Sequence, residues 1–215
     1  MSGLYPVYLN LDQKKCLVVG GGNVAERKVI SLLESGARVY VVSPALSDRL
    51  EEMAGEHKLT VIRRCYTTTD LEDAFLVIGA TDNPGINERV ARDCQERNIL
   101  VNIADNPDWC NFMVPAVLRQ GALSISISTD GKSPMLARRI RERLEPEFGP
   151  EYCEFLELMG NVREYVIRTI PEEKSRKDTF QRLIDSDILD LLKDGQREKV
   201  KERITHVLGD SWTQS

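Results

Sequence analysis

Three consecutive glycines after a short apolar run constrain this chain more than any other feature of its sequence. The run covers residues 15–19, the glycines are Gly20–Gly22, and a helical pattern of apolar residues follows. In a strand–loop–helix unit the first glycine permits a tight turn, and the one at Gly22 lets the backbone approach a pyrophosphate. Helix N-termini hold phosphates through free N–H groups. The pattern predicts a dinucleotide-binding loop, with a purely structural glycine turn as the alternative. The predicted cofactor contacts of this loop are Gly20, Gly22, Asn23, Val24 and Ala25.

Apolar and helical segments alternate through the first half of the 215 residues. Five buried strands separated by helices predict an α/β fold with a doubly wound, Rossmann-type parallel sheet. Residues 1–9 are a candidate edge strand. The strands are expected at 15–19, 38–42, 60–65, 75–80 and 99–104, and the helices at 24–35, 46–56 and 83–97.

The pattern changes in the second half. Residues 123–128 alternate serine and apolar residues and predict a half-buried strand, a helix is expected at 134–144, and helices with breaks near Pro171 and Gly195 follow residue 151. A lone strand exposes unpaired edges, so we expect residues 111–145 to pair with their copy in a homodimer. The predicted organisation is a Rossmann domain for NAD at 1–112, a small α+β dimerisation region at 113–147 and a helical C-terminal domain at 148–215.

Polar residues follow the second and fourth strands, at the edge where open α/β sheets bind ligands. Ser43 stands where NAD-binding proteins usually place an acid for the adenine ribose, and its hydroxyl can replace that acid. Thr81 and Asp82 are further cofactor candidates, although Asp82 is equally suited to cap the next helix. No arginine adjoins Ser43, so NAD is favoured over NADP. The arginines that could still approach a 2′-phosphate there are Arg49, Arg63 and Arg64.

Asp105 follows the fifth strand at the same edge, near the expected position of a nicotinamide. A carboxylate there can accept a proton while a hydride leaves for the cofactor. The alternative is an Asx turn with Asn106 and Pro107. Because both histidines, His57 and His206, are expected on solvated faces, carboxylates are the leading acid–base candidates.

The expected helix at 134–144 carries four arginines. Such a cluster can clamp a ligand with several carboxylates, since guanidinium matches carboxylate in a bidentate geometry. The alternative is a solvated face of mixed charge that includes Glu142 and Glu145. The arginines are Arg138, Arg139, Arg141 and Arg143.

Composition excludes several classes of protein. The net charge of −5 argues against a nucleic-acid binder, and no apolar run is long enough for a membrane span. The first ten residues lack the pattern of a signal peptide, so a cytoplasmic protein is expected. Five cysteines without CxxC spacing indicate neither a disulfide framework nor a metal site, and we expect buried, inert thiols.

Four stretches between Tyr8 and Glu145 together resemble the precorrin-2 dehydrogenase, or siroheme synthase N-terminal, family. They are Val-Val-Gly-Gly-Gly-x-Val-Ala-x-Arg-Lys at 18–28, Ala-Thr-Asp-Asn at 80–83, Val-Asn-Ile-Ala-Asp at 101–105 and Ser-Thr-Asp-Gly-x-Ser-Pro-x-Leu-Ala-Arg at 128–138. The resemblance implies a homodimer that oxidises the tetrapyrrole precorrin-2 to sirohydrochlorin with NAD+. It ties Asp105 to catalysis and places Thr129 in an active-site loop. The residues expected at the substrate are Asn106, Ser128, Thr129, Lys132 and Arg138.

Two other functions stay open from the sequence. Some members of this family also insert ferrous iron into sirohydrochlorin, and Asp105 would then receive pyrrole protons as the metal enters. A regulatory module that senses NAD without chemistry would share the Rossmann half. Such a module has no reason to carry the stretch at 128–138 or the arginine helix.

Overall fold

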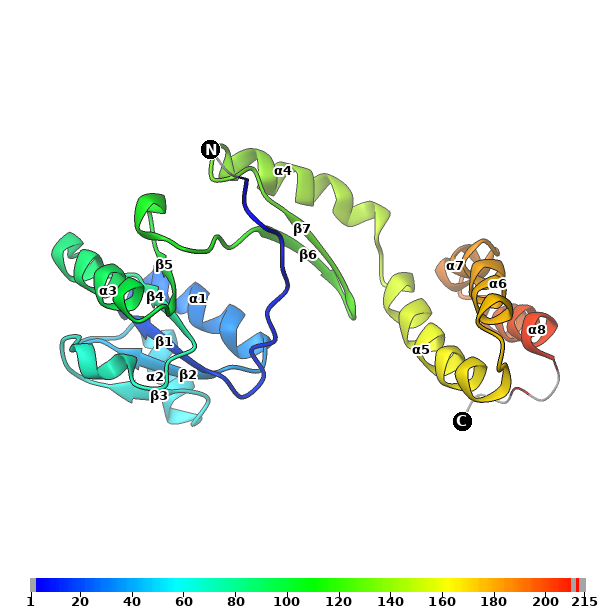
Figure 1. Ribbon diagram of the computed structural model, residues 1–215, viewed down its shortest axis with the longest axis horizontal. Helices are drawn as coiled ribbons and strands as arrows, with labels where there is room; N and C mark the ends of the chain where they lie inside the picture. The colour runs from blue at the N-terminus through cyan, green and yellow to red at the C-terminus, as the bar shows by residue number, and fades with distance from the viewer. Residues whose placement is uncertain (1–2, 210–211, 213–215) are drawn as a thin grey trace. The chain divides into compact units, whose positions relative to one another are not determined.

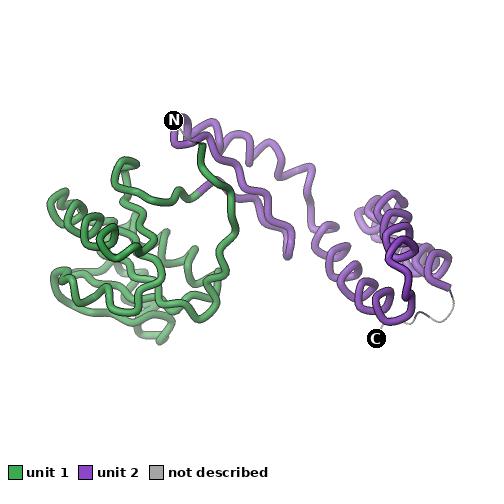
Figure 2. Tube along the Cα trace, viewed as in Figure 1, with its two compact units in different colours: residues 1–114 green, residues 115–215 purple. Residues whose placement is uncertain are grey.

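The chain divides into two compact units, residues 1–114 and residues 115–215 (Figure 2). The computed structural model describes residues 3–209 and residue 212. The further boundary expected near residue 147 lies inside the second unit and stays a prediction.

The first unit is built on a five-stranded parallel sheet with the order β3-β2-β1-β4-β5 (Figure 1). The predicted doubly wound α/β fold is confirmed. The strand order reverses between β1 and β4, and ligands of such sheets bind at this switch point. The strands are β1 (Lys15–Val19), β2 (Arg38–Val42), β3 (Thr60–Ile62), β4 (Leu76–Gly79) and β5 (Leu100–Ile103).

Helices cover both faces of this sheet because successive strand side chains point to opposite sides. On one face Cys16 and Val18 pack with buried residues of α1 (Asn23–Glu34) and α2 (Asp48–Gly55). On the other face Leu17 and Val19 pack with α3 (Pro84–Glu96).

Two predictions for this unit are wrong in detail. β3 ends at Ile62 rather than at residue 65, because the Arg64 N–H turns back to the Ile62 carbonyl at 3.0 Å. Residues 3–10 form no strand, and Tyr5 and Val7 there are exposed. Residues 1–2 of the expected edge strand lie outside the described residues.

The second unit begins with a hairpin of β6 (Ala116–Gln120) and β7 (Leu123–Ile127), paired antiparallel. The sequence predicted β7 but not β6, so the expectation of a strand without a partner in its own chain is wrong. Gly121 makes the turn at φ +55°. The predicted helix α4 (Pro134–Leu144) follows, with the Ser133 hydroxyl accepting a hydrogen bond from the Leu136 N–H at 3.3 Å.

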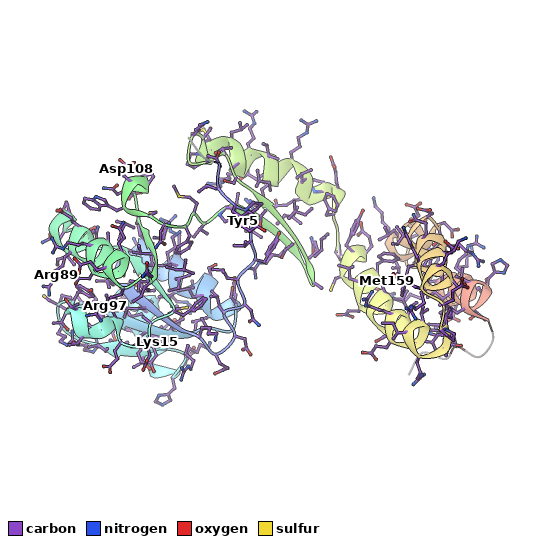
Figure 3. The ribbon with its side chains drawn as sticks, viewed as in Figure 1. Tyr5, Lys15, Arg89, Arg97, Asp108 and Met159 are labelled. Carbon is purple, nitrogen blue, oxygen red and sulfur yellow. The ribbon has the colours of Figure 1, made fainter. Side chains whose placement is uncertain are left out.

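The remainder of the second unit is helical, as predicted, and has its own apolar core. Met159 on α5 (labelled in Figure 3) packs against this core, as does buried Trp212. None of the helices in the described part of the chain is long and apolar enough to cross a membrane. The helices are α5 (Glu151–Thr169), α6 (Glu173–Ile184), α7 (Ile188–Lys193) and α8 (Arg197–Leu208).

Candidate functional site

A cleft of about 820 Å³ lies in the first unit, at the carboxyl ends of its parallel strands. This volume falls within the usual range for small-molecule sites. The cleft brings together loops that are far apart in sequence. Its walls include Gly20–Val24, Ser43–Ser47, Arg64–Tyr66, Ala80–Asn83, Ala104 and Asp105.

The three glycines of the β1–α1 loop have different steric roles. Gly20 has φ +124°, and a Cβ atom there would lie 2.2 Å from the Ala80 carbonyl oxygen. A Cβ atom on Gly21 would lie 2.0 Å from the Ala45 carbonyl oxygen, whereas one on Gly22 would meet nothing within 4 Å. Gly20 and Gly21 therefore bring the loop against its neighbours, and Gly22 leaves open space. The Gly20-x-Gly22 motif gives no role to Gly21. The uninterrupted run of three glycines is the sequence feature that could have indicated one.

The N-terminus of α1 offers backbone donors to this open space. Gly22 is the N-cap residue and provides no side chain to cap the helix. Asn23 and Val24 line the cleft beside it. Ala25 is completely buried against the sheet, so it acts in packing rather than in lining the cleft. Free N–H groups and the helix dipole suit a pyrophosphate here.

Ser43, at the end of β2, is buried and has its hydroxyl hydrogen engaged within the loop. Its Oγ donates to the Ala45 carbonyl at 2.6 Å, and its N–H donates to the Ile62 carbonyl at 3.2 Å. The hydroxyl therefore approaches a ribose only as an acceptor. The sequence suggested that this hydroxyl replaces the usual acid at the adenine ribose. Because its hydrogen is engaged, it can do so only by accepting a hydrogen bond.

The loop after β4 is held by a pair of side-chain hydrogen bonds. Thr81 Oγ1 donates to Asn87 Oδ1 at 2.8 Å, and Asn87 Nδ2 donates to the Thr81 carbonyl at 2.9 Å. Asn83 caps α3 by accepting from the Gly85 N–H at 3.0 Å, so the capping alternative for Asp82 is wrong. The sequence reasoning missed Asn87, whose signal is a polar residue on the buried face of α3.

Asp105 lines the cleft with its carboxylate unengaged. Among the described residues no group donates a hydrogen bond to that carboxylate, so the Asx-turn alternative is not observed. Its backbone is in the left-handed region at φ +61°. The pKa of Lys28 is lowered mainly by burial and also by Arg27, while the charges of Cys110 and Asp105 oppose this shift. Asp105 therefore presents a carboxylate to the cleft within electrostatic reach of an ammonium group.

The other predicted substrate residues divide between the two units. Asn106 adjoins the cleft loop, where its carbonyl accepts a hydrogen bond from the Cys110 thiol at 3.2 Å. Ser128 and Thr129, in the second unit, accept hydrogen bonds from the N–H groups of Asp130 and Ser133 at 3.2 and 3.0 Å. These two hydroxyls shape the turn before α4.

Two of the four arginines of α4 form ion pairs, Arg138 at an exposed position and Arg141 at a partly buried one. Arg138 binds Glu142 at 2.8 Å, and Arg141 binds Glu145. Lys132 is exposed in the turn before this helix. Arg138 and Arg141 thus have nearby carboxylate partners, which is a feature of the mixed-charge alternative.

The histidine prediction is confirmed and the cysteine prediction only in part. His57 and His206 are exposed. All five cysteines are free, but only Cys16 and Cys94 are buried, and Cys65 is exposed because it lies beyond the shortened β3. Burial raises the pKa of the Cys16 thiol to about 11.

Two family models match this sequence in succession. The model described as "Putative NAD(P)-binding" covers residues 7–116, and the model described as "Sirohaem biosynthesis protein central" covers residues 120–146. The first match contains every residue that lines the cleft.

Curated relatives and one solved structure agree with these models. The siroheme synthase of Thioalkalivibrio sulfidiphilus (strain HL-EbGR7) is 35% identical over 204 residues, which are 95% of this chain and 42% of the relative. That of Methylobacillus flagellatus is 35% identical over 207 residues, 94% of this chain and 44% of the relative. This chain thus spans less than half the length of these relatives. The structure of "SirC, precorrin-2 dehydrogenase" is 29% identical with a TM-score of 0.79, covering 95% of this chain and 98% of that one.

Proposed function

This chain belongs to the precorrin-2 dehydrogenase and siroheme synthase N-terminal family, and from that premise we propose that it oxidises precorrin-2 to sirohydrochlorin with NAD+. The observation that carries the proposal is the cleft that unites the glycine loop with Asp105. The likeness to the precorrin-2 dehydrogenase structure extends over nearly all of both chains.

The first unit supplies the binding site for the nicotinamide cofactor. The pyrophosphate is held by backbone N–H groups at the start of α1, where Gly22 leaves open space. Ser43 would then adjoin the adenosine and Asp105 the nicotinamide, since both residues line the cleft at the ends of their strands. The bound cofactor supplies a hydride acceptor. With both ligands bound, the loops of the cleft would hold the substrate close to this acceptor, which lowers the entropic barrier to transfer.

Asp105 is the proposed catalytic base. The reaction removes one hydride and one proton from precorrin-2, so that sirohydrochlorin, NADH and a proton are the products. Bound NAD+ would accept the hydride, and the Asp105 carboxylate takes the proton before passing it to solvent. Its carboxylate is exposed and unengaged in the described structure, so it can accept a proton without breaking an existing contact.

We further propose that the second unit contributes substrate contacts and a dimer interface. Precorrin-2 carries eight carboxylates, and charged residues of α4 and its preceding turn suit such a ligand. The proposal assigns the substrate contacts to Asn106, Ser128, Thr129, Lys132 and Arg138. It also includes a homodimer formed through residues 113–147 and a cytoplasmic location, which five free cysteines support.

Turnover of precorrin-2 tests the proposal directly. The full chain is incubated with precorrin-2 and NAD+, while NADH formation and the sirohydrochlorin spectrum are followed together. We expect equal amounts of both products. A folded protein that binds NADH but leaves precorrin-2 unchanged would contradict the proposal.

A further inference from the structure

Arg64 is the one lysine or arginine among the described residues that line the cleft. It follows β3, beside the end of β2, where the Ser43 N–H donates to the Ile62 carbonyl at 3.2 Å. In nucleotide-binding sheets the end of β2 receives the adenine ribose, and an arginine nearby accommodates the 2′-phosphate of NADP. Arg64 therefore stands where a cation would distinguish the two cofactors.

The guanidinium group of Arg64 already forms an ion pair with the carboxylate of Asp70. Its Nη1 and Nη2 atoms donate to the two carboxylate oxygens of Asp70 at 2.8 and 2.5 Å, a bidentate arrangement. The Asp70 side chain is only 3% exposed. It also accepts a hydrogen bond from the Thr67 N–H at 2.9 Å, which fixes it at the start of the 3-10 helix Thr68–Leu71.

The Asp70 carboxylate is ionised at neutral pH. Burial alone would raise the pKa of Asp70, but hydrogen bonds from Arg64 and Thr67 and the charge of Arg64 hold that pKa below its usual value. The pair thus places a full negative charge directly against the cation of the cleft.

We propose that Asp70 is a specificity-determining residue that withholds Arg64 from a 2′-phosphate, so that the cleft accepts NAD and disfavours NADP. This inference rests on the proposed function. Ser43 is neutral and cannot repel a phosphate as an acid at the end of β2 would. The discriminating carboxylate is instead provided by the loop after β3.

The chain contains a second arginine–carboxylate pair that serves as a matched control. Arg63 donates to both carboxylate oxygens of Glu51 at 2.7 and 2.6 Å, which is the same bidentate geometry. Arg63 is not among the residues that line the cleft. Releasing Arg63 therefore changes the charge of this region without freeing a cation at the ribose.

Fluorescence titration of the full chain with NADH and NADPH measures the preference without any turnover. In Asp70→Asn the amide oxygen still accepts from the Thr67 N–H, but the charge that holds Arg64 is gone. We expect NADPH affinity to rise relative to NADH by about tenfold, the scale of one charge-assisted hydrogen bond. Glu51→Gln should leave the ratio unchanged. Adding Arg64→Gln to Asp70→Asn should abolish the gain.

Each result decides the inference. A folded Asp70→Asn variant with an unchanged ratio overturns the inference, as does an equal gain in Glu51→Gln, and neither result affects the proposed dehydrogenation. A wild-type protein that prefers NADPH overturns the inference and the choice of NAD+ as cofactor, but leaves the oxidation of precorrin-2 standing. Wild-type protein that binds neither nucleotide overturns both. If Asp70→Asn does not fold, Arg64→Gln alone decides: an unchanged ratio supports the inference, and weaker NADPH binding relative to NADH overturns it.

Discussion

The Cys110 thiol accepts a hydrogen bond from the backbone N–H of Ile103, the last residue of β5, at 3.1 Å. The same sulfur donates to the Asn106 carbonyl at 3.2 Å. These two contacts bracket Asp105, whose backbone has φ +61°. One side chain therefore closes the loop that presents the proposed base to the cleft.

Removing the Cys110 thiol should lower activity by misplacing Asp105. In Cys110→Ala the Ile103 N–H loses its acceptor, at a cost of about 1–3 kcal/mol in the free energy of unfolding. We expect kcat to fall about tenfold or more, with NADH affinity little changed. Cys110→Ser should restore most of kcat. As a control, Cys94→Ala removes a buried thiol of α3 from the core. It should lower the free energy of unfolding without changing kcat. Equal kcat in Cys110→Ala and the wild type would contradict a positioning role.

Neutralising Asp105 should remove the proposed proton acceptor. Asp105→Asn keeps the size of the side chain and tolerates a left-handed backbone, so the fold should persist. We expect kcat to fall by about 10²–10⁴ while NADH affinity changes little. Asp108→Asn, at an exposed carboxylate three residues further along that does not line the cleft, is the matched control and should retain kcat within a few-fold. Normal turnover by Asp105→Asn would remove this carboxylate from the mechanism.

A methyl group on Gly21 should disrupt the nucleotide loop. Its Cβ would lie 2.0 Å from the Ala45 carbonyl oxygen, so Gly21→Ala must push the two loops apart. We expect a loss of about 1–3 kcal/mol in stability and a large loss of NADH binding. Gly55→Ala provides the comparison, because a Cβ there meets nothing within 4 Å and alanine favours the α2 helix. Thermal unfolding and NADH titration of both variants distinguish these outcomes.

The pair of Asp70 and Arg64 should make stability depend on pH. The pKa of Asp70 is lower in the folded chain than its ordinary value, so the unfolded state binds more protons in acid. The stabilisation is complete above the unfolded value of about 3.9 and is lost as pH falls through the lower, folded pKa. Asp70→Asn should cost about 1–2 kcal/mol at neutral pH, since Arg64 is partly exposed.

Urea unfolding at several pH values measures this dependence. The difference in unfolding free energy between the wild type and Asp70→Asn should shrink as the solution is acidified below about pH 4. Asp73→Asn, an exposed position without an ion pair among the described residues, should show no such trend. A difference that stays constant with pH would mean that the pair does not stabilise the fold through its charge.

Local sequence patterns were sufficient to predict most of the helices and strands of this fold. The continuous apolar run of β1, the three glycines and the serine cap at Ser133 each act over a few neighbouring residues. Contacts between residues so close in sequence form in any compact structure. The individual strands of the parallel sheet and the helix α4 were therefore predictable. β6 was missed because Ala116–Gln120 carries a weak pattern of its own and becomes a strand by pairing with β7.

The sequence by itself determined the strand–loop–helix unit that holds a nucleotide and the position of Asp105 at the end of a strand. Only the tertiary structure decided which side chains were free to act there. Asp105 keeps an unengaged carboxylate, whereas Arg64 is neutralised by Asp70 and the Ser43 hydroxyl is turned to its own loop. Hydrogen bonds between loops depend on distances of about an ångström, and spacing along a chain does not encode such distances.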